Sequence, residues 1–416
     1  MYIIRCMSFV LFLLLLAACS TDTDSKENVQ EEETEKITSI AQQSNELGFS
    51  MLERVERDEL GNAFLSPLSS FIALIIVNEG ADGDTKKEIE TLLSLNDISE
   101  DERREAVSAT LDMLERDLDD LTVKTANSLW LNDQYHFKSS FEDIMNAHYD
   151  AEINDISMRD ESSVKRINDW VRQATKDKIT KMIEGPLDDE TVLFILQTVY
   201  FNGTWKHAFT ADTNEERTFY TGKEDVTIPF MMLEEELYYE ETPDYEAVKI
   251  PYAHGEMSMY VILPKDDAMR DEVISNWANR SWDDIENSLT KKQGTVILPQ
   301  FQLEYEVNLE DVLTELGMER AFIKDMAQFP HFIEEDVPLW IDEIKQKTYV
   351  EVDETGTEAA GATSVEITTL SAPLEEDTFF MEVSRPFFMM ITDETTKTHL
   401  FVGDIVHPEQ KENSPS

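Results

Sequence analysis

The segment Asp353–Pro373 constrains this chain more than any other, because its side chains alternate between two unlike faces. Read with the two-residue period of a β-strand, Glu358 and Glu366 share one face. The other face carries small and then apolar side chains, namely Thr357, Ala359, Gly361, Thr363, Val365 and Ile367. A strand of this kind can lie in a sheet with its acidic face in water. The flanking residues favour an exposed loop, so we expect a segment that can form a strand without being held in one.

A short helix is the alternative for the same segment. Thr355 and Glu358 have the spacing of a helix capping box and precede an alanine run. Gly361 in the middle and the β-branched residues that follow it disfavour a helix. We therefore expect extended structure here.

The amino terminus has the pattern of an export signal. Arg5 precedes an apolar run from Phe9 to Leu16, which is too short to span a membrane stably. The box Leu16-Ala17-Ala18-Cys19 resembles that of bacterial lipoprotein signals, which implies cleavage before Cys19 and attachment of diacylglycerol to it. An ordinary signal peptide with a chance cysteine is the alternative. We expect residues 1–18 to be the signal peptide, and the mature protein to be exported and anchored to the cell membrane through Cys19.

Acidic residues dominate the composition. The chain has 35 basic and 87 acidic residues, which gives a formal charge of −52. Nucleic acid is not expected as a partner, because phosphate binding requires a basic surface. Residues 19–36 are polar and acidic, so we expect a disordered, flexible tether there. We expect residues 37–408 to form the folded domain and residues 409–416 a disordered tail.

The patterns between residues 37 and 408 predict one α+β domain. Helical periodicity dominates the first half, for example at Ser163–Met182, and short alternating strands dominate the second half. The apolar run Leu193–Phe201, interrupted by Gln197 and Thr198, predicts a strand that is buried on both faces. We find no internal repeat and no linker rich in proline or glycine, so we expect a single large domain.

The sequence lacks the motifs of common enzyme classes. It contains no Gly-x-Ser-x-Gly elbow, no His-Glu-x-x-His motif and no glycine pattern for nucleotides. Its seven histidines show no metal-ligand spacing. Cys6 would leave with the signal peptide, so the mature chain would keep only Cys19 and could form no disulfide. We expect no catalytic residue, no metal and no cofactor.

Five groups of residues, in order along the chain, resemble the serpin family. They are Asn62–Ser70 with Gly80–Thr85, Tyr200–Trp205, Met257–Pro264 with Leu309–Met318, Glu354–Thr363, and Ser384–Phe388. The resemblance extends from about Ile37 to Pro408. It implies the serpin fold, with three β-sheets, about nine helices and an exposed reactive-centre loop. It also implies an inhibitor of serine proteases rather than an enzyme.

The resemblance assigns a mechanism to the segment Asp353–Pro373. In the family, the protease's serine attacks the carbonyl carbon of a bait residue in the loop and forms an acyl-enzyme. The cleaved loop then inserts into the large sheet as a new strand and traps that acyl-enzyme. The family's spacing, carried over from Gly356, places the scissile bond between Leu370 and Ser371. The hinge that enters first corresponds to Glu354, Gly356, Thr357, Glu358, Ala359, Ala360, Gly361, Ala362 and Thr363.

The residues of the loop also indicate the kind of partner. Leu370 predicts a serine protease with an apolar primary pocket, of the chymotrypsin, elastase or subtilisin type. The small residues of the hinge favour an inhibitor, which we expect to be a monomer. A non-inhibitory, serpin-like binding protein that is cleaved without trapping is the alternative. A third alternative is an enzyme that is a lipoprotein and is unrelated to the serpins.

Three positions correspond to the region where the large sheet must open, namely Ser66, Gln197 and Gln346. The family usually has asparagine where this chain has Gln197 and histidine where it has Gln346. Both glutamines lie where strands must separate. We hypothesise that their two amides hydrogen-bond each other across the opening.

Overall fold

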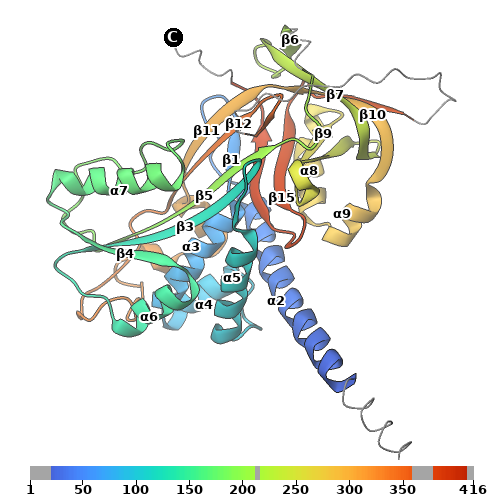
Figure 1. Ribbon diagram of the computed structural model, residues 1–416. Helices are drawn as coiled ribbons and strands as arrows, with labels where there is room; N and C mark the ends of the chain where they lie inside the picture. Colours follow the sequence, from blue (N-terminus) through green and yellow to red (C-terminus); the bar gives the residue numbers. More distant parts are fainter. Residues whose placement is uncertain (1–19, 211–215, 358–377, 410–416) are drawn as a thin grey trace, which may run out of the picture.

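The computed structural model describes residues 20–210, 216–357 and 378–409, with the backbone alone for residues 20–35 and 283. Two sheets form the centre of the molecule, and helices cover them (Figure 1). Nine α-helices lie within the described residues: α2 (Ser20–Leu52), α3 (Pro67–Gly80), α4 (Gly83–Leu92), α5 (Glu100–Leu114), α6 (Ser139–His148), α7 (Glu161–Ala174), α8 (Arg270–Ala278), α9 (Trp282–Ser288) and α10 (Glu310–Glu315).

The large sheet has the strand order β11-β12-β13-β5-β3-β2, and β4 pairs in parallel with β3 beside this path. Its strands are β2 (Arg116–Asp117), β3 (Leu121–Asn132), β4 (Ala151–Ile156), β5 (Leu193–Thr204), β11 (Phe301–Asn308), β12 (Lys345–Val352) and β13 (Gly356–Thr357). β13 is antiparallel to both of its neighbours, so β5 and β12 run in the same direction on its two sides.

The other nine strands form a second hydrogen-bonded sheet, in the order β1-β16-β15-β9-β8-β7-β10-β14 with β6 beside β7. They are β1 (Ala63–Leu65), β6 (Glu216–Phe219), β7 (Val226–Glu241), β8 (Tyr245–Pro251), β9 (Met257–Pro264), β10 (Thr290–Pro299), β14 (Phe379–Glu382), β15 (Phe387–Asp393) and β16 (His399–Ile405). The long strand β7 pairs with β6 at one end and with β8 at the other. β7 thereby joins two smaller sheets. Together with the large sheet, they give the three β-sheets that the serpin resemblance implied.

Helices cover both faces of the large sheet. On one face, Ile167 and Val171 of α7 pack with Trp130 of β3 and Leu196 of β5. On the opposite face, α3 packs against β5. Ser66 is the N-cap residue of α3, and its Oγ accepts a hydrogen bond from the backbone N–H of Ser69. Side chains of β5 therefore alternate between a layer containing α7 and a layer containing α3.

The tether expected at residues 19–36 stays a prediction, and the structure gives its backbone a helical conformation from Ser20 onward. The structure places Ser20–Leu52 in one helix, α2, which projects from the body of the molecule (Figure 1). Residues 20–36 contain neither glycine nor proline and are rich in glutamate, which favours helix. Among the side chains that the structure describes, the first buried one is that of Ile37, which is 4% exposed.

Candidate functional site

The chain turns back after β12 and enters the large sheet. The carboxylate oxygen Oδ1 of Asp353 accepts a hydrogen bond from the backbone N–H of Gly356 (3.1 Å), which closes the turn. β13 then lies between β12 and β5, with Thr357 opposite both Val352 and Gly203. The extended structure predicted for this segment is thus present at its first two strand residues.

Gly356 occupies a position that has no room for a side chain. A Cβ atom there would overlap the carbonyl oxygen of Gly203 and would lie 2.7 Å from the Cα atom of Thr204. Both are backbone atoms of β5, so they cannot swing aside as the end of a side chain could. Glycine is needed here because the two strands approach each other closely.

Aromatic residues hold the turn from outside; we call Trp205, Phe209 and Tyr252 the aromatic clamp. The backbone N–H of Trp205 donates to the carbonyl oxygen of Thr355 (2.9 Å), and its indole Nε1 donates to that of Asp353 (2.8 Å). The backbone N–H of Phe209 donates to the carbonyl oxygen of Glu354 (3.1 Å). The clamp therefore binds three successive backbone carbonyls of the turn.

Tyr252 holds the strand that follows the turn. Its hydroxyl lies 2.6 Å from the Oγ1 of Thr357, and its ring stacks on Trp205 with centroids 4.5 Å apart. Burial raises the pKa of Tyr252, so the hydroxyl stays protonated and can donate. The sequence patterns predicted no role for Phe209 or Tyr252. Tyr252 is 105 positions from Thr357 along the chain, and no local pattern indicates their contact.

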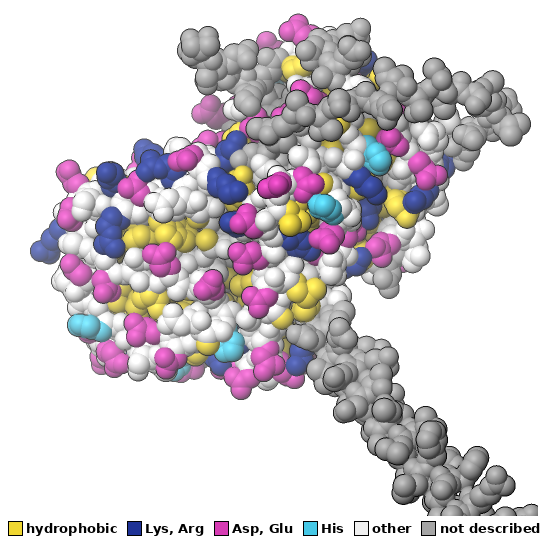
Figure 2. Space-filling view, in the orientation of Figure 1, with side chains coloured by type: hydrophobic (Ala, Val, Ile, Leu, Met, Phe, Trp, Pro, Cys, Tyr) yellow, Lys and Arg dark blue, Asp and Glu magenta, His cyan; other side chains and the backbone are white. Residues whose placement is uncertain are grey.

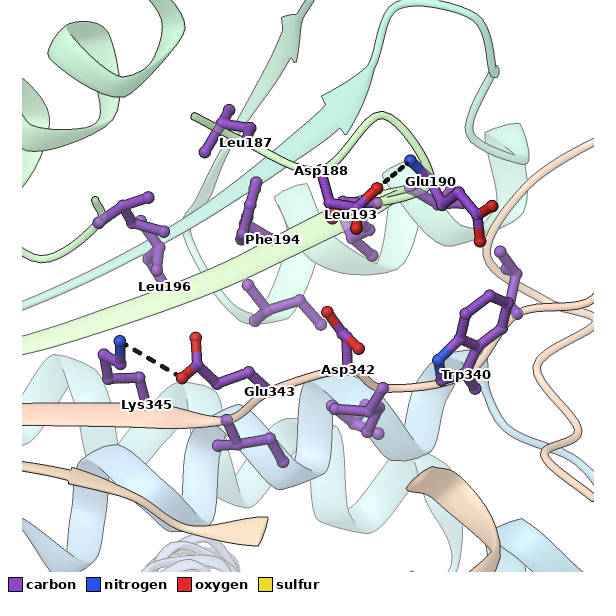
Figure 3. A pocket seen from close by; sticks show the side chains of 18 of the residues that line it. Leu187, Asp188, Glu190, Leu193, Phe194, Leu196, Trp340, Asp342, Glu343 and Lys345 are labelled. Atoms are coloured by element: carbon purple, nitrogen blue, oxygen red, sulfur yellow. Dashed lines mark hydrogen bonds and ion pairs between the residues drawn. The ribbon is translucent and has the colours of Figure 1, made fainter. Parts of the chain in front are cut away.

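We call the interval between β5 and β12 beyond Thr357 the slot. Within the residues that the structure describes, β13 is the only strand between them. A cavity of about 620 Å³ lies at the far end of the slot, below the first residues of β5 (Figure 3). Leu193, Phe194 and Lys345 line it from the two strands, and Leu187 and Trp340 line it from neighbouring loops.

This cavity corrects one expectation about β5. The strand was predicted to be buried on both faces throughout, but Leu193, Phe194 and Ile195 are only partly buried. Their apolar side chains pack against the hydrophobic cores on the two faces of the sheet and also line the cavity. Lys345 lines the cavity from β12 and forms ion pairs with Glu343 (3.3 Å) and Glu306 (3.5 Å). The positive charge at this end of the slot is therefore paired.

The three residues assigned to sheet opening do not form one network. Gln346 reaches the start of α3: its Oε1 accepts from the backbone N–H of Ser66 (3.0 Å). Its Nε2 donates to the carbonyl oxygen of Ser66 and to the Oγ of Ser70, both at 2.9 Å. Gln197 is buried, and neither atom of its amide has a hydrogen-bond partner. The hypothesis that the two glutamines bond each other was therefore wrong, because Gln346 is engaged by α3.

Several predicted site residues lie outside the described residues. They are the later hinge residues Glu358, Ala359, Ala360, Gly361, Ala362 and Thr363, the scissile pair Leu370 and Ser371, and Cys19. Their roles stay predictions. Across residues 20–210, 216–357 and 378–409, no cluster of three His, Cys, Asp or Glu side chains could hold a metal ion. In that same part of the chain, no helix is long and apolar enough to cross a membrane.

The surface carries charges of both signs despite the large net charge. Figure 2 shows Asp and Glu side chains spread over one face, with Lys and Arg side chains among them. Ion pairs join charges of opposite sign in the structure, for example Arg217 of β6 with Glu382 of β14 (2.8 Å). On this face the acidic excess is therefore distributed rather than gathered in one patch.

Comparisons with known proteins agree with this architecture. A family model described as serpin (serine protease inhibitor) matches residues 42–408. An uncharacterized serpin-like protein of Methanosarcina acetivorans is 30% identical over 385 residues, which cover 90% of this chain and 88% of that protein. Neuroserpin of Rattus norvegicus is 30% identical over 387 residues, which cover 88% of this chain and 90% of that protein.

Solved structures show the same fold. The crystal structure of a thermophilic serpin, tengpin, in the native state matches with a TM-score of 0.79 and 29% sequence identity. The match covers 89% of this chain and 94% of that one. The matched family model covers most of the chain, including β12, β13 and the aromatic clamp. The chain belongs to the serpin family.

Proposed function

We propose that this serpin inhibits serine proteases as a suicide substrate. Members of the family are generally protease inhibitors rather than enzymes. The serine Oγ of the protease attacks the carbonyl carbon of Leu370 and the bond to Ser371 breaks. The amine of Ser371 leaves with a proton from the protease's histidine, and an ester joins Leu370 to the protease. Insertion of the loop into the slot then traps this ester before water hydrolyses it.

The observation that supports this mechanism most is the position of β13. Gly356 and Thr357 are already paired between β12 and β5, at the entrance of a slot that is flanked by two parallel strands. A strand that extends from Thr357 would need no new turn to follow the slot. The residues that come next, Glu358 to Thr363, include alanine and glycine, which can enter between two strands without displacing either.

The bait residue and the amino terminus supply the finer parts of the proposal. Leu370 suits proteases with an apolar primary pocket, such as those of the chymotrypsin, elastase or subtilisin type. The lipoprotein-type signal suits an exported inhibitor that is anchored to the cell membrane through Cys19. Such an inhibitor would protect the cell surface from proteases released nearby.

Incubation with chymotrypsin, subtilisin and elastase tests the proposed function. We expect an adduct that survives SDS and has the mass of the protease plus the cleaved serpin. A loop that is cleaved with no adduct would favour the non-inhibitory binding protein instead. If the chain neither forms an adduct nor is cleaved in its loop, the proposal is wrong.

Leu370→Arg tests the position of the bait residue. An arginine there fits the acidic primary pocket of trypsin, so inhibition should move from chymotrypsin to trypsin. Leu370→Met is the matched control and should keep chymotrypsin as the target. If arginine at residue 370 shifts nothing, the scissile bond lies elsewhere, and Thr369 is the next bait residue to test.

A further inference from the structure

The cavity between the start of β5 and the chain before β12 has apolar walls that the fold leaves partly exposed. Its volume of about 620 Å³ lies within the range of small-molecule sites in proteins, roughly 300–1,000 Å³. Leu187, Leu193, Phe194 and Trp340 line it, and each of these side chains is only partly buried (Figure 3). A ligand with an apolar part would cover them and remove their surface from water.

Acidic side chains dominate the charged groups around this cavity. Lys345 is the one lysine or arginine among the described residues that line it, and its Nζ is already paired with two glutamates. Six carboxylates line the cavity with it, namely Glu184, Asp188, Glu190, Glu306, Asp342 and Glu343. An anionic ligand would be repelled by these groups, whereas a cationic one would be attracted.

Two of the six carboxylates are available to a cation from outside. The other four are paired with lysines: Glu184 with Lys181, Glu190 with Lys324, and Glu306 and Glu343 with Lys345. Asp188 accepts a hydrogen bond from the backbone N–H of Glu190 (2.8 Å). Within the described part of the chain, neither Asp188 nor Asp342 forms an ion pair. Figure 3 shows the carboxylate of Asp342 directed from its own segment toward β5.

Trp340 supplies a second kind of contact for a cation. Its ring lines the cavity, and the Nζ of Lys324 lies 4.2 Å from the ring centroid. A cation over the face of an indole ring is attracted by the ring's π electrons, and quaternary ammonium ligands are recognised in this way. Trp340 and Asp342 therefore place an aromatic face and a carboxylate two residues apart at the rim of an apolar cavity.

We propose that this cavity binds an amphiphilic cation, a molecule with one apolar chain and a quaternary ammonium head. The chain lies against Leu193 and Phe194, and the head lies at the rim near Trp340 and Asp342. The apolar walls select the chain, and the carboxylates select the charge of the head. This inference goes beyond the proposed function and does not depend on it.

Decyltrimethylammonium, kept below its micelle concentration, is the probe. Isothermal titration calorimetry with the intact protein should detect one site per molecule. Decyl sulfate has the same chain and the opposite charge, and it should bind at least about tenfold more weakly. Hexyltrimethylammonium keeps the head and lacks four methylene groups. It should bind more than about tenfold more weakly, because each buried methylene group strengthens binding by about fourfold.

Asp342→Asn tests the position of the head. It removes one exposed carboxylate at the rim and should weaken the binding of decyltrimethylammonium by about threefold to fivefold. Asp336→Asn is the matched control, because Asp336 is an exposed residue of the same segment that does not line the cavity. It removes the same charge and should leave the affinity unchanged.

Trp340→Leu tests the aromatic contact while it keeps an apolar wall. Binding of decyltrimethylammonium should weaken by about threefold to tenfold, and the weak binding of decyl sulfate should not change. Thermal unfolding of each variant checks that the fold is kept.

Three results would overturn the inference. If decyl sulfate bound as tightly as decyltrimethylammonium, the rim would not select a positive charge. If Asp342→Asn and Asp336→Asn weakened binding equally, the probe would be attracted by the acidic surface in general. If an uncharged apolar peptide occupied the cavity and decyltrimethylammonium did not, the ligand would be a polypeptide strand. No protease is present in these measurements, so they are independent of whether trapping occurs.

Discussion

The two edges of β5 differ in how far they are paired. Toward β3, the pairing runs without a break from Leu193 opposite Leu131 to Gly203 opposite Leu121. Toward β12, the strand that the structure describes is β13, which meets β5 only at Gly203 and Thr204. Within the described residues, one edge of β5 is paired along its length, and we call it the finished edge; the other is paired at two residues, and we call it the unfinished edge. A strand added to the unfinished edge would gain backbone hydrogen bonds and cover an open sheet edge.

The two edges of β5 therefore have different roles. The finished edge stabilises the sheet, and the unfinished edge is the one at which we propose that the loop inserts. The finished edge joins β5 to β3, which in turn carries β4 and β2. The unfinished edge ends in the slot, and the aromatic clamp holds β13 at its entrance. Substitutions along the two edges should therefore have different consequences, and three predictions use this difference.

The largest effect is expected from Thr357→Arg, which puts a charge at the entrance of the slot. Thr357 is 2% exposed and lies between two strands. Burying an unpaired guanidinium costs several kcal/mol, so insertion should slow by more than about tenfold. The protease should then cleave the variant without being trapped, which titration of residual chymotrypsin activity measures.

Thr125→Arg on β3 is the control for the finished edge. Thr125 lies opposite Val199 and is half-buried. This variant should lower the unfolding temperature but still trap the protease. If Thr357→Arg trapped chymotrypsin as well as the wild type does, the insertion mechanism assigned to this edge would be wrong.

Gly356→Ala should have an intermediate effect, because its Cβ atom would overlap the backbone of β5. Relieving such an overlap costs about 1–3 kcal/mol, and the simplest relief is for β13 to leave the sheet. Hydrogen exchange at the amide of Thr357 should speed up while the amides of β3 stay protected. Gly403→Ala in β16 is the comparison: its Cβ atom would meet the Phe64 ring at 2.7 Å, and a side chain can shift. Equal effects of the two variants would contradict this account.

The smallest effect is expected from Tyr252→Phe, which removes one hydroxyl from the aromatic clamp. The Oγ1 of Thr357 then loses a partner at 2.6 Å, at a cost of about 1–2 kcal/mol. Hydrogen exchange at Thr357 should again report the loss. Tyr260→Phe in β9 removes a similar bond, to Glu394 (3.1 Å), far along the chain from the slot. It should leave exchange at Thr357 unchanged; a change there would mean that the clamp is not local.

Much of the fold follows from periodicity in the sequence. Leu193–Phe201 was expected to be a buried strand, and β5 covers these residues. Ser163–Met182 was expected to be helical, and α7 covers the first part of that range. Apolar patterns predict such elements because each must bury one face or two. They do not predict that the first residues of β5 line a cavity, since this depends on which elements pack beside them.

The amino-terminal segment shows a different limit. Its acidic composition predicted a disordered tether, whereas the structure has a continuous helix from Ser20 to Leu52. A high net charge indicates that a segment is not buried in a core, but it does not indicate the conformation of the segment's backbone. The absence of glycine and proline before Ile37 was the signal that favoured helix.

By itself, the sequence determined the family resemblance, the single α+β domain and the two-faced segment that begins at Asp353, because these depend on local residue types and their spacing. Only the tertiary structure decided that Tyr252 and Trp205 hold the start of this segment, and that Gln346 bonds α3 while Gln197 bonds nothing. Those contacts join residues that are far apart in the chain. Hydrogen bonds between side chains depend on distances of a few ångströms that only the packed chain sets.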